Sequence, residues 1–281
     1  MTPVPGCPDP AKLLAAAPFV EVAVDGLVPG GMVEPESADE VAAVLAEGAR
    51  RKFACAPIGG GTKLALGNPL ERLDVALSTR RLGGVIDYVP TDLVLSVGAG
   101  AKVGDVQAIL AEHGQGLPID APADATIGGL IATALAGPRR LGYGTLRDLL
   151  IGIAVAHPGG TVTHAGGMVV KNVSGFDLPR VYHGSLGTLG VIVSANFKVL
   201  PLPRHETTIL AAYDSLAEAL AAAGRVRGSR LRPTALEVTN SGGGWGIAVR
   251  LEGRPDTLSP AADETRRLTG GDAWTLEGGE S

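Results

Sequence analysis

An apolar strand runs directly into three consecutive glycines in the stretch Pro57-Ile58-Gly59-Gly60-Gly61-Thr62-Lys63. Glycine has no Cβ, so successive glycines let neighbouring N–H groups converge on one anion and form a concave nest. Thr62 and Lys63 add a hydroxyl and a positive charge beside that nest. The stretch predicts a loop that binds phosphate oxygens, although a plain glycine-rich turn would show the same pattern. A Walker A loop is excluded, because no Gly-Lys-Ser/Thr sequence occurs in the chain.

The elements on both sides of this loop alternate between helix and strand. Ser37 is the expected N-cap of the first helix, and Glu40 three residues later completes a capping box. A short apolar strand over 54–58 then leads into the glycines. The further expected elements of this region are strands over 73–77, 85–89, 93–97, 149–156, 161–164 and 191–199, and helices over 103–113 and after Thr126. This order predicts a mixed α and β fold.

A second candidate ligand segment is Pro122-Ala123-Asp124-Ala125-Thr126-Ile127-Gly128-Gly129. Thr126 is the expected N-cap, and the start of a helix offers free amides and the positive end of a dipole. The small residues Gly128, Gly129, Ala132 and Thr133 would let a flat ligand come close to that helix. A tightly packed helix would account for the same pattern equally well.

Two later runs place polar side chains and bare backbone beside an apolar strand, which suits contacts to the edge of a ring system. They are Lys171-Asn172-Val173-Ser174-Gly175-Phe176-Asp177 and Gly184-Ser185-Leu186-Gly187-Thr188-Leu189-Gly190. Neither contains the G-x-S-x-G nucleophile elbow of a hydrolase.

The run Gly98-Ala99-Gly100-Ala101-Lys102-Val103-Gly104 follows an expected strand and opens an expected helix, as a nicotinamide-dinucleotide fingerprint does. Its third glycine is one residue late for G-x-G-x-x-G. The acid expected about 20 residues further on would be Asp120, which lies in a loop beside proline and not at a strand end. The sequence therefore gives little support to a nicotinamide site here.

The composition excludes several classes of protein. With 24 basic and 29 acidic residues, the net charge is −5, and no dense basic run is present to neutralise nucleic-acid phosphates. No stretch reaches the roughly 18 uninterrupted apolar residues of a membrane span. The first ten residues lack the basic and apolar regions of a signal peptide, so we expect a cytoplasmic protein.

Cysteine and histidine give no support to a metal or cluster site. Cys7 and Cys55 form no C-x-x-C pair, and two cysteines cannot ligate an iron–sulfur cluster by themselves. The five histidines form no H-x-H or H-E-x-x-H pattern. We expect no metal site, and among the histidines only His183, beside Gly184, stands next to a candidate ligand segment.

Pro201 and Pro203 interrupt the chain, and the pattern then starts again. This predicts two domains, over 1–203 and 204–281. The elements expected in the second are strands over 207–213, 235–239, 245–251 and 273–276, and helices over 215–225 and 259–268. Their order is βαββαβ, the ferredoxin-like arrangement.

Taken in order, five motifs resemble the FAD-binding domain of the vanillyl-alcohol-oxidase (PCMH-type) flavoprotein superfamily. They are Pro57 to Thr62, Thr126 to Gly129, Tyr143-Gly144 with Arg147-Asp148, Lys171-Asn172 with Gly175 to Leu178, and Gly184 to Gly190. Within the superfamily the segment from Gly137 to Gly152 is most similar to the FAD-binding subunits of bacterial glycolate oxidases. The resemblance covers residues 30–203 well and implies an α+β fold, with a two-subdomain FAD-binding domain followed by a small ferredoxin-like cap.

The resemblance also implies which residues bind FAD. The glycine loop and Lys63 would surround the diphosphate, the segment after Thr126 would approach the diphosphate and the flavin, and the region from Gly184 to Ile192 would contact the cofactor through its backbone. The complete implied set is Pro57, Ile58, Gly59, Gly60, Gly61, Thr62, Lys63, Pro122, Thr126, Gly128, Gly129, Thr133, Lys171, Gly187, Gly190 and Ile192. Some relatives place a linking histidine beside the glycine loop, where this chain has Thr62 and Lys63, so we expect non-covalent FAD.

Two departures from the resemblance bear on catalysis. Catalytic subunits read Gly-Ser-Glu-Gly-Thr-Leu-Gly, whereas this chain has Leu186 in place of the glutamate, and they carry a C-terminal His-x-His that this chain lacks. Oxidation of a 2-hydroxy acid needs a base for the hydroxyl proton. No residue of the sequence is an evident candidate for that base, so the catalytic residues stay unassigned.

The function that these features predict is that of an FAD-binding subunit of a glycolate or related 2-hydroxy-acid oxidoreductase, not competent alone. It would transfer electrons within a complex that contains a catalytic flavin subunit and an iron–sulfur subunit. Two alternatives stay open. One is a self-sufficient FAD-dependent dehydrogenase, and the other is an assembly subunit that keeps the fold without flavin.

Overall fold

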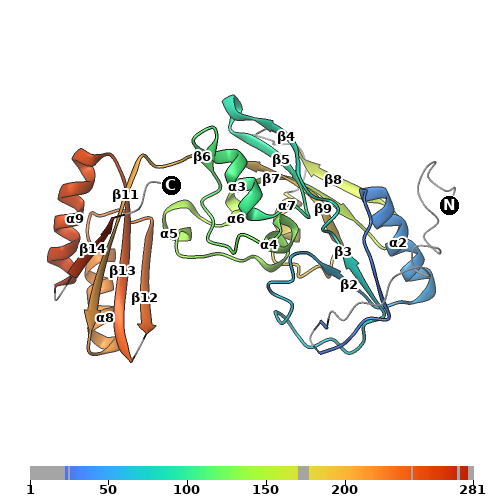
Figure 1. Ribbon diagram of the computed structural model, residues 1–281, viewed down its shortest axis with the longest axis horizontal. Helices are drawn as coiled ribbons and strands as arrows, with labels where there is room; N and C mark the ends of the chain where they lie inside the picture. The colour runs from blue at the N-terminus through green and yellow to red at the C-terminus, as the bar shows by residue number, and fades with distance from the viewer. Residues whose placement is uncertain (1–22, 25, 170–176, 242, 271–272, 278–281) are drawn as a thin grey trace. The chain divides into compact units, whose positions relative to one another are not determined.

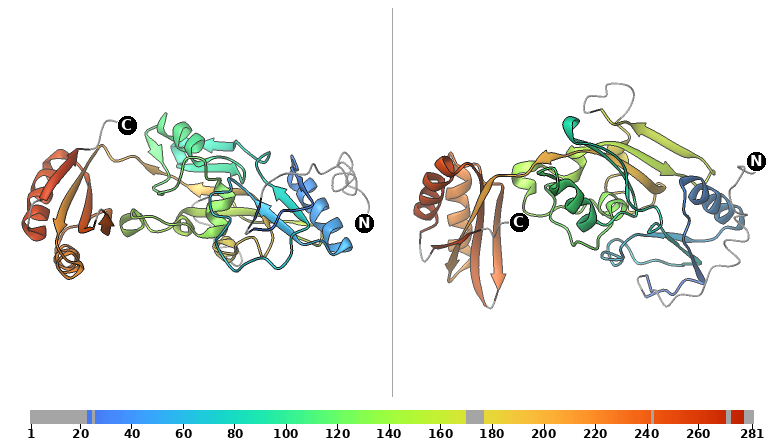
Figure 2. Two further views of the ribbon diagram at one scale, coloured as in Figure 1. Left: turned by 60° about the horizontal axis from the view of Figure 1, so that its bottom comes forward. Right: turned by 45° about the horizontal axis from the view of Figure 1, so that its top comes forward.

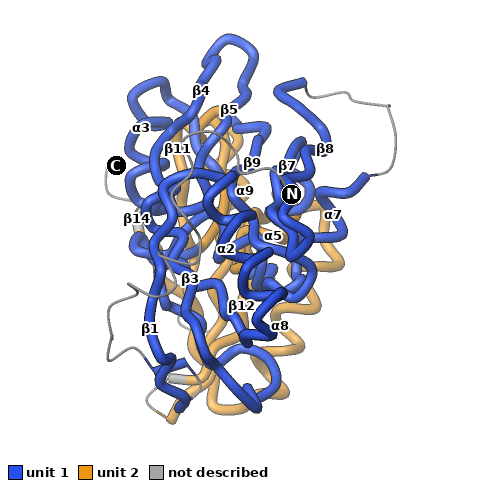
Figure 3. The backbone as a smooth tube through the Cα atoms, turned by 90° about the vertical axis from the view of Figure 1, so that its right-hand side faces the viewer, with its two compact units in different colours: residues 1–117, 121–135, 146–200 blue, residues 118–120, 136–145, 201–281 orange. Residues whose placement is uncertain are grey.

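The structure is a computed structural model of the 281-residue chain, and it describes residues 23–24, 26–169, 177–241, 243–270 and 273–277 (Figure 1). The chain forms two compact units, which Figure 3 shows in different colours. Unit 1 consists of residues 1–117, 121–135 and 146–200. Unit 2 consists of residues 118–120, 136–145 and 201–281.

A three-stranded parallel sheet in unit 1 leads into the glycine loop. Its strand order is β1-β3-β2, with β1 over Gly31–Val33, β2 over Cys55–Ile58 and β3 over Val75–Ser78. Because β2 and β3 are parallel, with Ile58 opposite Ser78, the residues that follow both strands lie at the same edge of the sheet.

Helix α2 (Ala38–Arg51) connects β1 to β2. Ser37 is its N-cap, and the Ser37 hydroxyl accepts a hydrogen bond from the Glu40 amide at 3.2 Å. The Glu40 carboxylate accepts from the Glu36 amide and not from that of Ser37, so the predicted capping box closes one residue earlier than expected. Val41 and Val44 are buried against the three-stranded sheet and the second sheet of the unit, so one core joins both.

The second sheet of unit 1 is antiparallel, with strand order β4-β5-β9-β7-β8. Its strands are β4 (Val85–Val89), β5 (Val94–Gly98), β7 (Leu150–Ala156), β8 (Val162–Gly166) and β9 (Val191–Lys198). Helix α4 (Ile127–Thr133) packs against β5 and β9 and thereby places its first turn beside the glycine loop. The other elements before residue 202, apart from α5 of unit 2, are η1 (Pro90–Asp92), α3 (Val103–Ala111), β6 (Gln115–Gly116), α4 (Ile127–Thr133), α6 (Leu146–Leu149), α7 (Pro179–Tyr182) and β10 (Leu200–Pro201).

Unit 2 is an antiparallel sheet with two helices on one face, as Figures 1 and 2 show. In chain order its elements are β11 (His205–Tyr213), α8 (Leu216–Gly228), β12 (Ala235–Ser241), β13 (Gly244–Gly253), α9 (Pro255–Thr269) and β14 (Ala273–Glu277). The strand order is β12-β13-β11-β14. Ile209, Ile247 and Val249 of the sheet are buried against Ala219 and Ala222 of α8.

Two short segments from the middle of the chain belong to unit 2. Asp120 lies in one, and Arg139 in the other, and their side chains form an ion pair at 2.6 Å. The second segment contains α5 (Arg140–Tyr143), where the Tyr143 hydroxyl donates to the buried Glu252 carboxylate of β13. Desolvation and this carboxylate raise the pKa of Tyr143 to about 12. The domain boundary after residue 203 stays a prediction. It lies close to the start of the last part of unit 2 at residue 201, but it does not account for residues 118–120 and 136–145, which also belong to that unit.

The predicted mixed α and β fold is confirmed. Most of the predicted order of helices and strands also agrees with the structure, and the errors fall mainly on short elements. Strand β1 and helices α5, α6 and α7 were not expected, because elements of three or four residues have no periodicity to read. Helix α9 begins at Pro255 and not near 259, with Pro255 at its first position, where a missing N–H costs no hydrogen bond.

Candidate functional site

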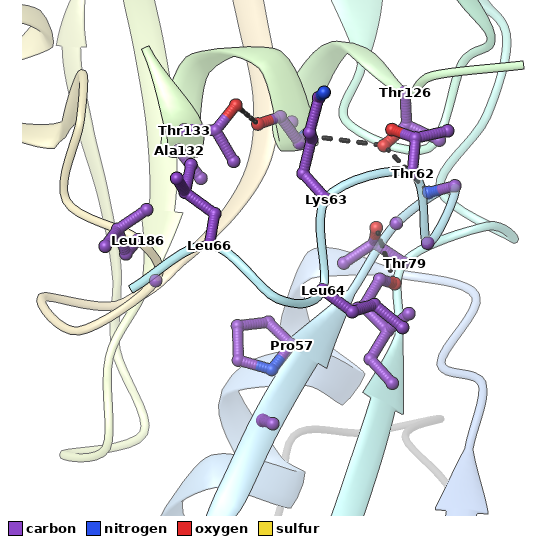
Figure 4. Close-up of a pocket in the computed structure, with 18 of the residues that line it drawn as sticks. Pro57, Thr62, Lys63, Leu64, Leu66, Thr79, Thr126, Ala132, Thr133 and Leu186 are labelled. Atoms are coloured by element: carbon purple, nitrogen blue, oxygen red, sulfur yellow. Dashed lines mark hydrogen bonds between the residues drawn. The ribbon is translucent and has the colours of Figure 1, made fainter. Parts of the chain in front are cut away.

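Three segments of unit 1 surround a cavity of about 190 Å³ (Figure 4). They are the end of β2 with the glycine loop, the first turns of α4, and the segment from Leu186 to Ile192. Thr79, at the end of β3, also lines the cavity, and its hydroxyl donates to the Ile58 carbonyl at 3.4 Å.

The three loop glycines are needed for two different reasons. A Cβ on Gly59 would lie 2.1 Å from the Thr126 Oγ1 atom, and one on Gly60 would lie 2.5 Å from the Asp124 carbonyl oxygen. These two glycines therefore allow the loop to pack directly against the start of α4. Gly61 has open space around it, with the nearest atom 3.9 Å away, but its φ of +79° is a conformation that favours glycine.

Thr126 joins the glycine loop to α4. It is the N-cap of the helix and only 3% exposed. Its hydroxyl oxygen accepts hydrogen bonds from the amides of Gly129 and Gly60, each at 3.3 Å. The predicted N-cap is confirmed. The same side chain also holds the glycine loop in place, through its hydrogen bond from the Gly60 amide.

The amides at the start of α4 are not free, which corrects the reasoning from the sequence. The Ile127 amide donates to the Ala101 carbonyl at 3.0 Å, and the Gly128 amide donates to the Ala99 carbonyl at 2.8 Å. The Gly129 amide donates to Thr126. The segment after β5 and the Thr126 side chain together use these amides, so α4 contributes a wall of mostly small residues to the cavity and no set of anion donors.

The donors that remain lie in the glycine loop itself. Within the described part of the chain, the amides of Gly61, Thr62 and Lys63 donate no hydrogen bond. The Lys63 side chain is exposed and forms no ion pair with any described residue. Because the Gly60 amide donates to Thr126, the predicted anion nest would consist of the amides of residues 61–63 and not of the three glycines.

Arg80 is a second cation at the loop, and no sequence motif marks it. Its Nε atom donates to the Gly59 carbonyl at 3.2 Å. Gly59 is the first residue after β2 and Arg80 the second after β3, so the parallel pairing of these strands brings them together. Arg80 could have been found from the sequence only by first predicting that β2 and β3 are parallel neighbours.

The segment after α7 closes the cavity from the other side. The Gly184 and Leu186 amides donate to the carbonyls of Ile131 and Ala132 at the end of α4, at 2.9 and 2.8 Å. A Cβ on Gly187 would lie 2.6 Å from the Pro57 Cγ atom, and the φ of Gly187 is +75°. Leu186 has a φ of 52° and exposes 42% of its surface beside the cavity.

The structure brings most of the predicted cofactor residues together. Those that line the cavity are Pro57, Ile58, Gly59, Gly60, Gly61, Thr62, Lys63, Thr126, Gly128, Gly129, Thr133, Gly187, Gly190 and Ile192. Pro122 is exposed and does not line it, but its carbonyl accepts from the Ala125 amide at 3.0 Å and so shapes the turn before α4. Lys171 lies outside the described residues. Lining residues that the sequence analysis missed include Leu64, Leu66 and Leu70, which follow the loop without a recognisable motif.

His183 precedes the closing segment but does not line the cavity. Partial burial and the nearby Arg147 guanidinium hold the pKa of His183 below its ordinary value, although Asp148 acts in the opposite direction. No group of three potential metal ligands occurs among the described residues, and no described helix is long and apolar enough to cross a membrane.

The model of the FAD binding domain family matches residues 29–175, which is more than half of the chain and includes the glycine loop and α4. The chain belongs to this FAD-binding family. The prediction of FAD as the cofactor and of the PCMH-type superfamily is therefore confirmed.

Similar curated proteins include glycolate oxidase subunit GlcE of Escherichia coli, 38% identical over 154 residues, which are 54% of this chain and 43% of that protein. D-lactate dehydrogenase of Anaerostipes hadrus is 31% identical over 77% of this chain and 46% of its own length. The chain thus spans less than half the length of these relatives. Among solved structures, an alkyldihydroxyacetonephosphate synthase shares the fold, with a TM-score of 0.72 at 20% identity over 89% of this chain and 52% of that one.

The residues around the cavity fit part of FAD. Pockets that enclose a whole ligand usually hold roughly 300–1,000 Å³, so about 190 Å³ suits one portion of a dinucleotide. Three unused amides and the Lys63 charge at one end suit a diphosphate. Gly128, Gly129 and Gly187 line the cavity without side chains, so a ligand could come close to the backbone at these three positions.

Proposed function

We propose that this chain is the FAD-binding subunit of a glycolate or related 2-hydroxy-acid oxidoreductase, and that it transfers electrons within a complex. The observation that carries the proposal is the cavity at the glycine loop, where donors and a cation without protein partners meet a wall of small residues. The names of the relatives, a glycolate oxidase subunit and a D-lactate dehydrogenase, indicate the substrate class.

The amides of Gly61, Thr62 and Lys63 would hold the diphosphate of FAD, and the Lys63 ammonium would balance its charge. Thr126 would keep the loop in place, because its hydroxyl oxygen accepts from the Gly60 amide. Arg80 would also hold the loop, because its Nε atom donates to the Gly59 carbonyl. When bound, FAD supplies the acceptor for a two-electron oxidation.

FAD would be held without a covalent bond. The side chains of the loop that line the cavity are those of Thr62 and Lys63, and neither is the histidine to which flavin is attached in some relatives. Denaturation in acid should therefore release the cofactor completely.

The oxidation of the 2-hydroxy acid would take place on another subunit. Leu186 lines the cavity at the position where catalytic relatives have a glutamate, and a hydrocarbon side chain can neither accept a proton nor orient a hydroxyl group. A catalytic flavin subunit and an iron–sulfur subunit would supply the base and the path for electrons.

The test combines three readings on the purified full chain. Its absorbance spectrum shows whether flavin is present, acid precipitation shows whether that flavin is released, and anaerobic addition of glycolate shows whether it is bleached. We expect flavin that is released by acid and is not bleached by glycolate. Absence of flavin from a folded chain that also rejects added FAD would favour an assembly subunit. Rapid bleaching would favour a self-sufficient dehydrogenase.

A further inference from the structure

Unit 2 carries a local excess of positive charge in a chain whose net charge is −5. Four arginines and no acidic residue occur between residues 225 and 232, over the last turn of α8 and the loop that follows it. They are Arg225, Arg227, Arg230 and Arg232. Within the described part of the chain, none of the four forms an ion pair with a carboxylate.

A groove of about 610 Å³ lies between the C-terminal ends of α8 and α9, and we name it the arginine groove. Arg225 and Arg230 line it from the side of α8, and Arg267 lines it from the side of α9. Leu231 and Leu268 are half-buried at the edge of the unit 2 core and also line the groove. The groove thus combines guanidinium groups with an aliphatic surface.

The three guanidinium groups differ in how far the protein already satisfies them. Arg267 forms two hydrogen bonds with the Glu264 carboxylate, both at 2.7 Å, so its charge is balanced. Arg225 donates from Nε to the Leu268 carbonyl at 2.7 Å and from Nη2 to that of Thr269 at 3.1 Å, which caps the end of α9. Arg230 is exposed, and its side chain makes no hydrogen bond with any described residue.

The turn that carries Arg230 is nevertheless held in place. The Ser229 hydroxyl donates to the Val226 carbonyl at 2.7 Å and accepts from the Leu231 amide at 3.1 Å. Arg230 therefore extends from an ordered turn, and a group that binds it does not have to order the backbone first. Glu264 also lines the groove, but its carboxylate is already paired with Arg267 of the same helix at 2.7 Å, so Arg225 and Arg230 carry the positive charge that no described carboxylate balances.

We propose that the arginine groove is a docking site for an acidic segment of a partner protein that also carries aliphatic side chains. A carboxylate of the partner would bind Arg230 and the unused Nη1 group of Arg225, and an aliphatic side chain would cover Leu231 and Leu268. A nucleic acid is disfavoured, because the whole chain is acidic and the arginines occupy one short groove. The proposal rests on the subunit role stated under the proposed function.

The experiment uses a fluorescently labelled ten-residue peptide of alternating glutamate and leucine, and measures its anisotropy as the full chain is added at low salt. The test variant is Arg230→Gln. The matched control is Arg227→Gln, since Arg227 is also exposed and without a described partner but does not line the groove. We expect Arg230→Gln to weaken binding about fourfold at low salt, because one exposed charge pair is worth less than about 1 kcal/mol, and Arg227→Gln to weaken it less than twofold.

Several results would overturn the proposal. They are absence of binding, equal weakening by both variants, or equally tight binding of a polyglutamate peptide without leucine or of inorganic triphosphate. FAD content is measured on the same samples and should not change in either variant, because the groove and the FAD cavity share no residue. A chain that binds the peptide but no FAD would contradict the proposed function and leave the docking site in place.

Discussion

Two glycine-rich segments of unit 1 resemble each other in sequence but differ in what their backbone does. Gly59 to Gly61 follow β2, and Gly98 to Gly100 end and follow β5. In the second segment the amides are used inside the protein, since Gly98 donates to Gly84 and Gly100 to Leu82, each at 3.0 Å. In the first, the amides of Gly61, Thr62 and Lys63 have no partner in the described part of the chain, and these residues border the cavity.

The difference shows that a glycine pattern alone does not identify a ligand site. A Cβ on Gly98 would lie 2.0 Å from the Leu82 carbonyl oxygen, and one on Gly100 would lie 2.0 Å from that of Thr79. Glycine is required at these two positions because a side chain would collide with the neighbouring backbone, and neither residue lines the cavity. The weak resemblance of this segment to a nicotinamide-dinucleotide fingerprint therefore has a packing explanation. What distinguishes a binding loop is the presence of unused donors.

The largest effect should follow Gly98→Ala. The added Cβ would collide with the backbone of Leu82, which cannot rotate away as a side chain can, so we expect a loss of about 3 kcal/mol or more in the free energy of unfolding. Urea unfolding of the FAD-free chain measures it. The control is Gly224→Ala in α8, where a Cβ meets nothing within 4 Å and alanine should stabilise the helix by about 0.5–1 kcal/mol. An unchanged midpoint for Gly98→Ala would refute the packing explanation.

Gly60→Ala should mainly reduce FAD binding. Its Cβ would lie 2.5 Å from the Asp124 carbonyl oxygen, so the exposed loop has to move and the hydrogen bond to Thr126 is lost. We expect FAD affinity to fall about 100-fold, with a loss of only about 1–2 kcal/mol in the stability of the FAD-free chain. Fluorescence titration and urea unfolding give the two numbers. If stability falls while affinity is unchanged, this glycine has only a packing role, as Gly98 does.

Gly61→Ala separates conformation from collision. No atom lies closer than 3.9 Å to the added Cβ, but a φ of +79° costs an alanine about 1 kcal/mol. We expect FAD affinity to fall about fivefold as the loop relaxes. Asparagine tolerates this conformation better than alanine, so Gly61→Asn should recover part of the affinity. Equal losses in the two variants would mean that the positive φ is not the reason for this glycine.

The sequence predicts the glycine loop and the Thr126 cap, because both depend on neighbouring residues. It could not show that Ala99 and Ala101 use the amides at the start of α4, since that contact joins segments far apart in the chain. Arg80 was missed for the same reason, because it meets Gly59 only through the pairing of β2 with β3. Likewise, nothing local indicates that residues 118–120 and 136–145 pack with unit 2.

Lys63→Gln should have the smallest effect of the series. The side chain is exposed and has no described ion pair, so the free energy of unfolding should not change. One exposed charge facing a diphosphate is worth less than about 1 kcal/mol, so FAD affinity should fall only about threefold. The decrease should become smaller at high salt, because screening weakens exposed charge pairs. A loss of affinity that does not depend on salt would indicate a steric role for this side chain.

The most direct test of the FAD site compares two ligands on two proteins. FAD and riboflavin share the flavin ring, but only FAD has the diphosphate that the loop is proposed to hold. Wild-type chain and Gly60→Ala are each titrated with both ligands, and bound flavin is followed by fluorescence. We expect the substitution to reduce the affinity for FAD about 100-fold and to leave that for riboflavin within about twofold. Equal losses for the two ligands would show that the glycine loop does not bind the diphosphate.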